Sequence, residues 1–393
     1  MKNILIVNIS AHGHVNPTIK LVKDLISFGN KVTYYSTEDF REKIEGAGAT
    51  FKSYEYKEIK GKDGGRGDEK TLISNMVNLA DAVLSEVLKE TQKFDCLIYN
   101  SVLSVGKNIA EKLNIEKTIS FYTTFAFSKD MVNMFAKNTN ASNNNVDFRK
   151  MLASFEEATQ DINKKYDIKV KNMIETMINS EADLNLVFTS KYYQPFAQEF
   201  DDKFIFVGPS LTERTEQIDF KLEKDKDKKL IYISLGTIDN QNLDFYKKTF
   251  EAYGSMKDVQ VVLSVGKKTN ISDLGDIPQN FKVYNYVPQL EVLKKTDVFV
   301  THGGMNSSSE GLYNNIPLIV VPQFGDQFMV AARVVQLSAG VSLIKDVDSD
   351  SIKEAVNKIL ENDSYKENAR KIGESLKEAG GYKRGANLLH EIL

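Results

Sequence analysis

The apolar positions in the first half of the chain follow two alternating patterns, short continuous runs and helical repeats. Residues 4–9, 31–36 and 96–99 form apolar runs that predict buried strands. Between the first two runs, Ile19, Val22, Leu25 and Ile26 recur at the spacing of an amphipathic helix, and 105–113 repeats that spacing after the third run. Strands that alternate with helices predict βαβ units and a parallel sheet.

The second half resumes this alternation after a charged break. Predicted strands lie at 230–235, 259–265, 281–286, 298–301 and 318–321, with helical sequence between them. The segment 210–229 is charged and poor in apolar residues, which is typical of a linker. The pattern therefore predicts an α/β protein with two doubly wound, Rossmann-like domains at 1–209 and 230–372. The last residues predict a charged helix.

Two stretches of the first half depart from this pattern. Residues 124–180 lose the strand signal and become helical and polar, with a predicted surface loop at 138–145. The glycine-rich stretch 61–67 lacks both the G-x-x-x-x-G-K-[ST] order and a preceding strand. We therefore interpret it as a flexible loop and not as a phosphate-binding loop.

Composition and charge narrow the class of protein. The 393 residues include 51 basic and 54 acidic side chains, and the resulting charge of −3 argues against broad contact with nucleic acid. No apolar stretch approaches the length of a membrane span, and the start has no convincing secretory signal, so a cytoplasmic protein is expected. The one cysteine, Cys96, lies in an apolar run and is expected to be buried and inert.

The first candidate for chemistry is AHGHVNP, residues 11–17, directly after the first predicted strand. Ligands of open parallel sheets bind at the carboxyl ends of strands, so His14 is expected to face a cleft. An ordinary histidine pKa of about 6.5 suits a general base at neutral pH. The alternative is that His14 only packs or caps the loop. Pro17 is expected in the first turn of the next helix, and His12 is expected to be structural.

The second candidate is THGGMNSSSEG, residues 301–311, where a strand is followed by two glycines and a helix expected to start near Asn306. Glycines let an anion approach the backbone, and a helix start favours phosphate. His302, Asn306 and Ser307 can add donors. The segment does not read G-x-G-x-x-G, which argues against a nicotinamide cofactor.

Three further predicted strand ends carry binding groups. Asp326 and Gln327, in PQFGDQ, suit the vicinal hydroxyls of a sugar, although a simple turn would explain them too. Tyr286, in YVPQ, offers an aromatic face on which a base could stack. Ser234 and Thr237 add small hydroxyl donors.

Together these segments resemble the nucleotide-sugar-dependent glycosyltransferases of family 1. Enzymes of that family carry G-H-x-x-P near the start, then aromatic-x-P-Q, T-H-x-G-x-N-S-x-x-E and P-x-x-x-D-Q. Here these segments read GHVNP (13–17), YVPQ (286–289), THGGMNSSSE (301–310) and PQFGDQ (322–327), in the same order and spacing. The resemblance is faint only in 124–180, and it is greatest to the bacterial branch that glycosylates macrolides and flavonoid-like phenols.

The resemblance implies a GT-B fold, in which two Rossmann-like domains face each other across a cleft and the last helix, here 373–393, packs back on the first domain. It implies inverting transfer of a hexose from a UDP-sugar, most often UDP-glucose, which is a co-substrate and not a resident cofactor. His14 would be the base. No carboxylate cluster offers a metal site, so we expect a metal-independent reaction.

By matching position, the resemblance also assigns the donor-binding residues. Tyr286 would stack on uracil, and the Val287 main chain would read the edge of that base. Gln289 and Glu310 would hold the ribose. The diphosphate would be held by His302, Gly304, Asn306 and Ser307 near Thr237, and the sugar hydroxyls by Asp326 and Gln327.

One position departs from the family pattern. The family places an aspartate after the strand that here ends at Tyr99, and that aspartate orients the histidine, whereas this chain has Asn100. An amide oxygen can fix the tautomer of His14 but cannot stabilise the imidazolium with a negative charge. In hydrolases with a similar pair, the change from Asp to Asn costs about 10⁴ in rate. We therefore expect a weaker base, a stand-in such as Ser101, or acidic acceptors.

Three alternatives remain open: an enzyme with lipid acceptors, a UDP-sugar-binding protein that has lost catalysis, and a sugar-nucleotide epimerase on the same fold. The balanced charge gives no basic patch for a membrane surface, and the further acid and base groups of an epimerase are not identifiable. The expected partners are the UDP-sugar and a small hydrophobic hydroxylated acceptor, with no nucleic acid and no stable membrane insertion. A monomer or weak dimer is expected. Apolar side chains at 121–131 could line an acceptor pocket or belong to the core.

Overall fold

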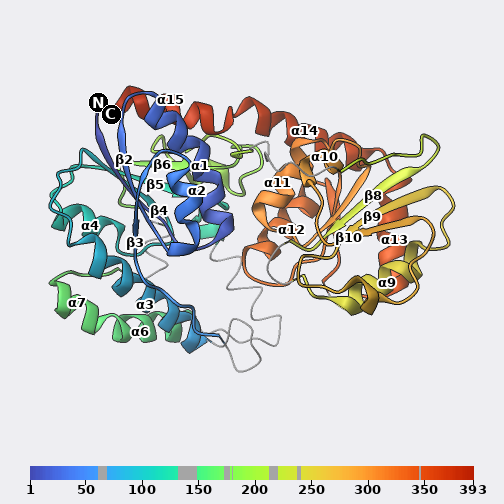
Figure 1. The fold of residues 1–393 in the computed structure, drawn as a ribbon, viewed down its shortest axis with the longest axis horizontal. Coiled ribbons are helices and arrows are strands. Elements are labelled where there is room, and N and C mark those ends of the chain that lie inside the picture. The colour runs from blue at the N-terminus through green and yellow to red at the C-terminus, as the bar shows by residue number, and fades with distance from the viewer. Residues whose placement is uncertain are drawn as a thin grey trace. The chain divides into compact units, whose positions relative to one another are not determined.

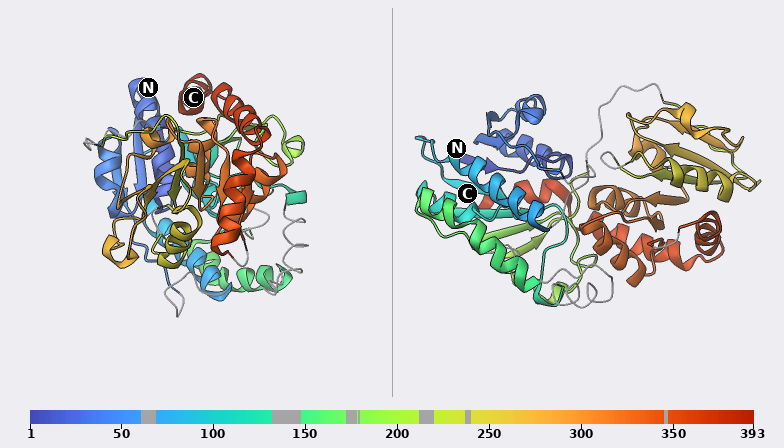
Figure 2. Two further views of the ribbon diagram at one scale, coloured as in Figure 1. Left: turned by 90° about the vertical axis from the view of Figure 1, so that its right-hand side faces the viewer. Right: turned by 90° about the horizontal axis from the view of Figure 1, so that it is seen from below.

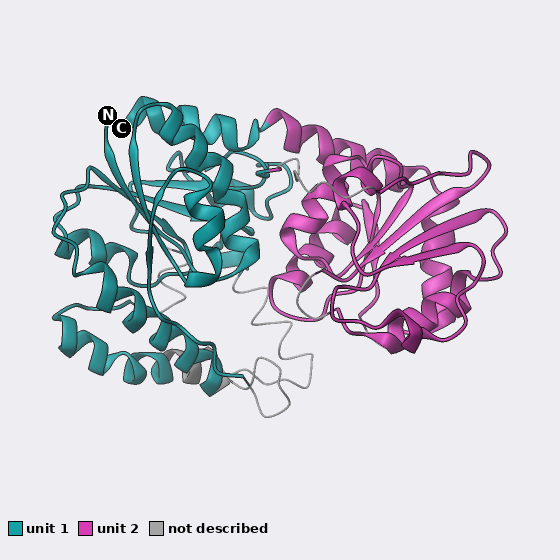
Figure 3. Cartoon of the chain, in the orientation of Figure 1, with its two compact units in different colours: residues 1–210, 379–393 teal, residues 211–378 magenta. Residues whose placement is uncertain are grey.

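The computed structural model describes residues 1–60, 69–131, 148–171, 178, 180–211, 220–236, 240–344 and 347–393 (Figure 1). Contacts divide the chain into two compact units (Figure 3). Unit 1 comprises residues 1–210 and 379–393, and unit 2 comprises 211–378. The loops predicted at 61–67 and 138–145 and residues 212–219 of the predicted linker lie outside the described residues.

Unit 1 is built on a seven-stranded sheet with the order β3-β2-β1-β4-β5-β6-β7, in which every pairing is parallel. The order runs outward in both directions from β1 and β4, so the switch point of the sheet lies between these two strands. The strands are β1 (Asn3–Val7), β2 (Lys31–Ser36), β3 (Thr50–Ser53), β4 (Cys96–Asn100), β5 (Lys117–Tyr122), β6 (Leu184–Val187) and β7 (Phe204–Phe206).

Helices cover both faces of this sheet (Figures 1 and 2). One apolar core joins the sheet to α1 (His12–Ser27), α2 (Arg41–Glu45) and α15 (Gly381–Ile392). The core on the other face includes α3 (Glu69–Val87), α4 (Gly106–Lys112), α6 (Phe148–Ala158) and α7 (Gln160–Tyr166). Because strands buried on both faces favour apolar residues at successive positions, β1 and β4 appear in the sequence as nearly continuous apolar runs.

The last helix belongs to unit 1. Ala386 and Leu389 of α15 are fully buried in the core that contains α1, and the rings of Phe28 and His390 lie 4.6 Å apart. The preceding helix, α14 (Ser364–Glu378), belongs to unit 2. The segment that returns to unit 1 therefore begins at Ala379, six residues after the predicted 373.

Unit 2 is built on a six-stranded parallel sheet with the order β10-β9-β8-β11-β12-β13, whose switch point lies between β8 and β11. The strands are β8 (Lys229–Ser234), β9 (Val259–Ser264), β10 (Phe281–Tyr284), β11 (Val298–Thr301), β12 (Leu318–Val320) and β13 (Gly340–Ser342). Apolar side chains of α9 (Leu243–Tyr253) and α13 (Ser349–Leu360) pack on one face. The remaining helices are α10 (Gln289–Leu293), α11 (Met305–Tyr313), α12 (Asp326–Gln336) and α14.

Several sequence expectations can be compared directly with this fold. The α/β class with two Rossmann-like sheets is confirmed. Helix α1 begins at His12, so Pro17 lies inside the helix and not in its first turn. Cys96 is fully buried, and burial raises the pKa of its thiol to about 12, which confirms an inert cysteine. Within the described part of the chain, no helix combines the length and hydropathy needed to cross a bilayer.

Candidate functional site

The site in unit 2 gathers where the parallel strands β8, β11 and β12 end at one edge of the sheet. The strand β11 stops at Thr301, and α11 begins at Met305 with Gly304 as its N-cap residue. No side chain caps the first turn, and no acidic residue lies in it. The start of α11 therefore carries the partial positive charge of the helix dipole, which favours a bound anion. Asn306 and Ser307 are both in this first turn, as predicted for a phosphate site.

The ring of His302 fits between the backbones of two glycines. A Cβ atom added to Gly236 would lie 2.7 Å from Cε1 of His302, and one added to Gly304 would lie 2.4 Å from Nε2. Gly236 also has a φ of +86°, which side chains with a Cβ rarely adopt. Burial lowers the pKa of His302 to about 4, so the imidazole is neutral at pH 7. His302 can thus offer a diphosphate one hydrogen bond but no full positive charge.

The two residues that the sequence assigns to the ribose are in direct contact. Nε2 of Gln289 donates to the Glu310 carboxylate at 2.5 Å and to Oγ of Ser307 at 3.1 Å. Its Oε1 accepts from the hydroxyl of Tyr232 at 3.2 Å. Glu310 and Gln289 are buried, at 7 % and 8 % relative exposure. The network joins β8, α10 and α11, and through Gln289 it links the carboxylate of Glu310, in the middle of α11, to Ser307 in the first turn.

Four further residues of the predicted donor site are Tyr286, Val287, Ser234 and Thr237. The ammonium of Lys267 lies 5.4 Å from the ring centroid of Tyr286, which is cation–π range. Val287 is buried beside it in the chain, and Ser234 is buried at the end of β8. Thr237 lies outside the described residues.

The predicted sugar-binding pair begins α12. Asp326 is the first residue of the helix, after Gly325 with a φ of +56°. Gln327 is buried, and its Oε1 accepts the backbone N–H groups of Gln323 at 2.8 Å and Phe324 at 3.3 Å. The carbonyl of the Gln327 side chain thus closes the loop that precedes the helix. Its amide nitrogen is the group that remains to donate to a ligand.

The candidate site in unit 1 lies at the switch point between β1 and β4. His14 is in the first turn of α1, which follows β1, and Asn100 is the last residue of β4. Nδ1 of His14 lies 2.9 Å from Nδ2 of Asn100 and 2.8 Å from Oγ1 of Thr123. The structure therefore brings together the two predicted residues, His14 and Asn100, and adds Thr123.

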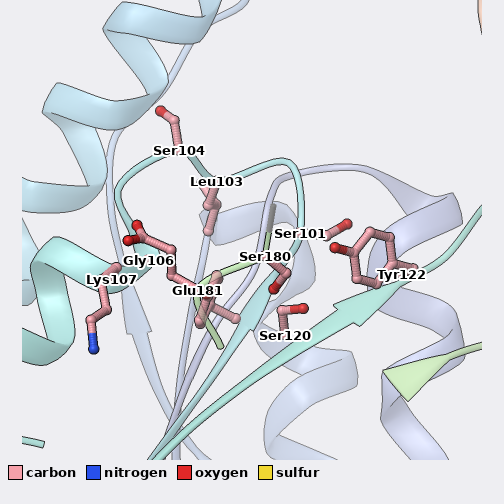
Figure 4. A pocket seen from close by; sticks show the side chains of 10 residues that line it. Ser101, Leu103, Ser104, Gly106, Lys107, Ser120, Tyr122, Ser180 and Glu181 are labelled. Carbon is pink, nitrogen blue, oxygen red and sulfur yellow. The ribbon is translucent and has the colours of Figure 1, made fainter. Parts of the chain in front are cut away.

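The sequence did not identify Thr123. Thr123 directly follows β5, and β5 pairs with β4 so that Phe121 lies opposite Asn100. A prediction that recognised β5 could have placed Thr123 at the same sheet edge as His14. The suggested stand-in, Ser101, instead lines a small pocket of unit 1 (Figure 4). The other residues that line this pocket are Tyr99, Leu103, Ser104, Gly106, Lys107, Ser120, Tyr122, Ser180 and Glu181.

Other residues of unit 1 that were considered for function pack within the fold. The ring of His12 packs edge-on against Phe40, with centroids 5.1 Å apart, and partial burial lowers its pKa. Of the apolar candidates for an acceptor pocket, Phe121, Phe125 and Met131 are buried, as expected if they belong to the core, whereas Phe127 is half-buried. Among the residues that the structure describes, no group of three or more His, Cys, Asp or Glu side chains could hold a metal ion.

Comparison with known proteins agrees with these features. Residues 248–379 match the family described as "Erythromycin biosynthesis protein CIII-like, C-terminal domain". The UDP-glucosyltransferase YojK of Bacillus subtilis strain 168, described as uncharacterized, is 37 % identical over 409 aligned positions. This alignment covers 100 % of the chain and 98 % of the relative.

Two solved structures share the whole fold. The glycotransferase of kitacinnamycin has a TM-score of 0.85 and 25 % identity, and the match covers 100 % of this chain and 99 % of that structure. CalG4, the calicheamicin glycosyltransferase, has a TM-score of 0.84 and 25 % identity, and the match covers 100 % of this chain and 98 % of that structure. The chain therefore belongs to the family 1 glycosyltransferases with the GT-B fold.

Proposed function

We propose that this glycosyltransferase moves a hexose, glucose in the simplest case, from a UDP-sugar to a hydroxyl of a small hydrophobic acceptor, with inversion at the anomeric carbon. The observation that carries the proposal is the site of unit 2. There, an uncapped helix start, two glycines around a neutral histidine, and the buried Gln289–Glu310 pair lie at one edge of a parallel sheet. Each part suits one portion of a nucleotide diphosphate sugar.

The donor would be bound along that edge. The start of α11, with Asn306, Ser307 and the N–H of His302, would hold the diphosphate. The carboxylate of Glu310 and Oε1 of Gln289 would accept hydrogen bonds from ribose hydroxyls, and Tyr286 would stack on the uracil. Asp326 and the amide nitrogen of Gln327 would bind the sugar. The name of YojK supports UDP-glucose as the donor.

His14 would act as the general base on the acceptor. Its Nε2 takes the proton of the acceptor hydroxyl while that oxygen forms a bond to the anomeric carbon. The bond from this carbon to the phosphate oxygen breaks, and UDP leaves with the electron pair. The reaction requires the acceptor side of unit 1 and the donor side of unit 2 to act on the same pair of substrates.

The leaving group would be stabilised without a metal ion. Negative charge grows on the departing phosphate oxygen, and the preorganised N–H groups and dipole of α11 would meet it. We therefore expect turnover to continue in the presence of a chelator. Loss of all turnover on addition of EDTA, restored by a divalent cation, would contradict this part of the proposal.

The acceptor class is supported by the comparisons. The matched family is named for erythromycin biosynthesis, and the two similar structures are named for kitacinnamycin and calicheamicin. The family name favours macrolides as the first acceptors to try, and flavonoid-like phenols follow from the sequence resemblance alone.

The test is incubation with UDP-glucose and a panel of phenols, flavonoids and macrolides, with products identified by mass and UDP release measured in parallel. Product with an added hexose, and UDP release that depends on the acceptor, support the proposal. Replacement of UDP-glucose by dTDP-glucose tests the choice of nucleotide. UDP binding with no product from any acceptor would favour a protein that has lost catalysis.

A further inference from the structure

The side chains that surround Nδ1 of His14 have hydrogen-bond directions that neighbouring groups determine. Oδ1 of Asn100 accepts the backbone N–H of Val102 at 3.1 Å, and a backbone N–H can only donate. The amide nitrogen of Asn100 is therefore turned the other way. It lies 2.9 Å from Oδ1 of Asn8 and 2.9 Å from Nδ1 of His14.

The orientation of Asn8 is determined in the same way. Its Nδ2 donates to the backbone carbonyl of His14 at 2.9 Å, and a carbonyl can only accept. Its Oδ1 accepts the backbone N–H of Ile9 at 2.8 Å. If the Asn100 amide were rotated by half a turn, its oxygen would face Oδ1 of Asn8, and its NH₂ group would face the backbone N–H of Val102. The arrangement thus presents an N–H of Asn100 to Nδ1.

An N–H directed at Nδ1 favours the neutral tautomer in which the proton is on Nε2. In that tautomer Nε2 has no lone pair for the proton of an acceptor hydroxyl. Asn100 therefore does more than remove a negative charge. It opposes the tautomer that the proposed base needs.

The hydroxyl of Thr123 is the group that can support the other tautomer. Its Oγ1 lies 2.8 Å from Nδ1, and a hydroxyl can accept a hydrogen bond as well as donate one. We propose that Thr123 is the positioning residue of this enzyme: it accepts a hydrogen bond from the protonated Nδ1 of His14, so that Nε2 carries the lone pair that the base needs. This inference rests on the proposed role of His14.

Proton transfer is balanced in this scheme. Nε2 takes the proton of the acceptor hydroxyl, while Nδ1 keeps its own proton, which is hydrogen-bonded to Oγ1 of Thr123. The resulting imidazolium later returns one proton to water. A neutral hydroxyl stabilises that cation less than a carboxylate does. The enzyme should therefore favour hydroxyls that ionise readily, so phenols should react faster than aliphatic alcohols.

The variants Thr123→Val and Thr123→Ser test this role, because valine keeps the shape of threonine without the hydroxyl and serine keeps the hydroxyl. Loss of a hydrogen bond to a group that becomes charged predicts a fall in kcat of roughly 10- to 100-fold for Thr123→Val. Thr123→Ser should recover most of the rate. UDP affinity should not change, because the predicted donor residues belong to unit 2.

A matched control is Thr189→Val, which removes another buried threonine hydroxyl of unit 1. The residue is fully buried, and its Oγ1 has no partner among the described residues. It should leave kcat and UDP affinity unchanged. The penalty of Thr123→Val should also grow as the acceptor becomes less acidic, which a packing defect would not produce.

The Asn100→Asp background supplies a second readout. A carboxylate can accept the Nδ1 proton itself, so Thr123→Val should cost much less there than in the native background. An equal loss in both backgrounds, or full activity of Thr123→Val in the native background, would overturn the inference. If the His14→Ala variant keeps full turnover, His14 is not the general base and that part of the proposed function is wrong. If His14→Ala is inactive but Thr123→Val is fully active, only the role of Thr123 is contradicted.

A measurement without turnover completes the test. In protein labelled with ¹⁵N in histidine, the ring nitrogen shifts of His14 report which nitrogen carries the proton. We expect the Nδ1-protonated fraction to fall in Thr123→Val and to be retained in Thr123→Ser. The same tautomer population in all three proteins would overturn the role of Thr123.

Discussion

Replacing Asn100 with aspartate should increase the rate of glycosyl transfer. The increase should be smaller than the effect of a carboxylate in the histidine–carboxylate pairs of hydrolases. The new carboxylate would accept the Nδ1 proton of His14 across about 2.9 Å, the present distance to the amide nitrogen. In hydrolases with a histidine–carboxylate pair, that carboxylate is worth about 10⁴ in rate. The same oxygen would, however, face Oδ1 of Asn8, which now accepts from the amide at 2.9 Å.

This opposition reduces the gain. Two acceptors that face each other without a proton lose one hydrogen bond and leave buried groups unsatisfied, which costs about 1–3 kcal/mol. A penalty of that size corresponds to roughly 10- to 100-fold if it falls on the active arrangement of His14. We therefore expect a net rise in kcat of about 10²- to 10³-fold, together with a protein that is less stable by about 1–3 kcal/mol.

The assay is initial UDP release over a series of phenols and alcohols of increasing pKa, with product mass as confirmation. The rise should be greatest for the least acidic acceptors, since these depend most on the base. Urea unfolding measures the stability cost, and UDP titration checks the donor site. An unchanged or lower rate in a folded variant with normal UDP affinity would refute this reading of Asn100.

Three further predictions concern other parts of the chain. Gly304→Ala places a Cβ 2.4 Å from Nε2 of His302, so UDP affinity measured by calorimetry should fall about 10-fold or more, and unchanged affinity would contradict the placement. Because the His302 pKa is about 4 in the fold and 6.5 without it, the free energy of unfolding should fall as pH drops through that window, by up to about 3 kcal/mol, and His302→Gln should remove this dependence in urea melts. Leu389→Ala, in the core beneath α15, should lower the stability of unit 1 by about 2–5 kcal/mol in thermal unfolding. The exposed control Glu391→Ala should change it by less than about 0.5 kcal/mol.

Strands β1, β2 and β4 of unit 1 and β8, β9, β11 and β12 of unit 2 could be predicted from the sequence because their residues are mostly buried. The runs at 31–36 and 298–301 match β2 and β11 residue for residue. The outer strands β3, β6, β7 and β13 were not predicted. They have only three or four residues each, which is too short for a periodic signal and allows turn residues to mask them.

The candidate site was predictable where chemistry follows a recognised strand. Gln289 and Glu310 are 21 positions apart in the chain and in contact in the fold, as their assignment to one ribose implies. Thr123 could not be found in this way, because its strand, β5, was not recognised. The direction of the Asn100 amide depends on hydrogen bonds to Asn8 and Val102 and cannot be read from residue types alone.

The account depends most on His14 as the base of a glycosyl transfer. The most direct test compares native protein and His14→Ala with UDP-glucose and a phenol acceptor, and follows the glucosylated product by mass. We predict a loss of kcat of at least about 10³-fold in the variant, with UDP affinity unchanged. Product formation by His14→Ala at the native rate, with a weakly acidic alcohol as acceptor, would contradict the account.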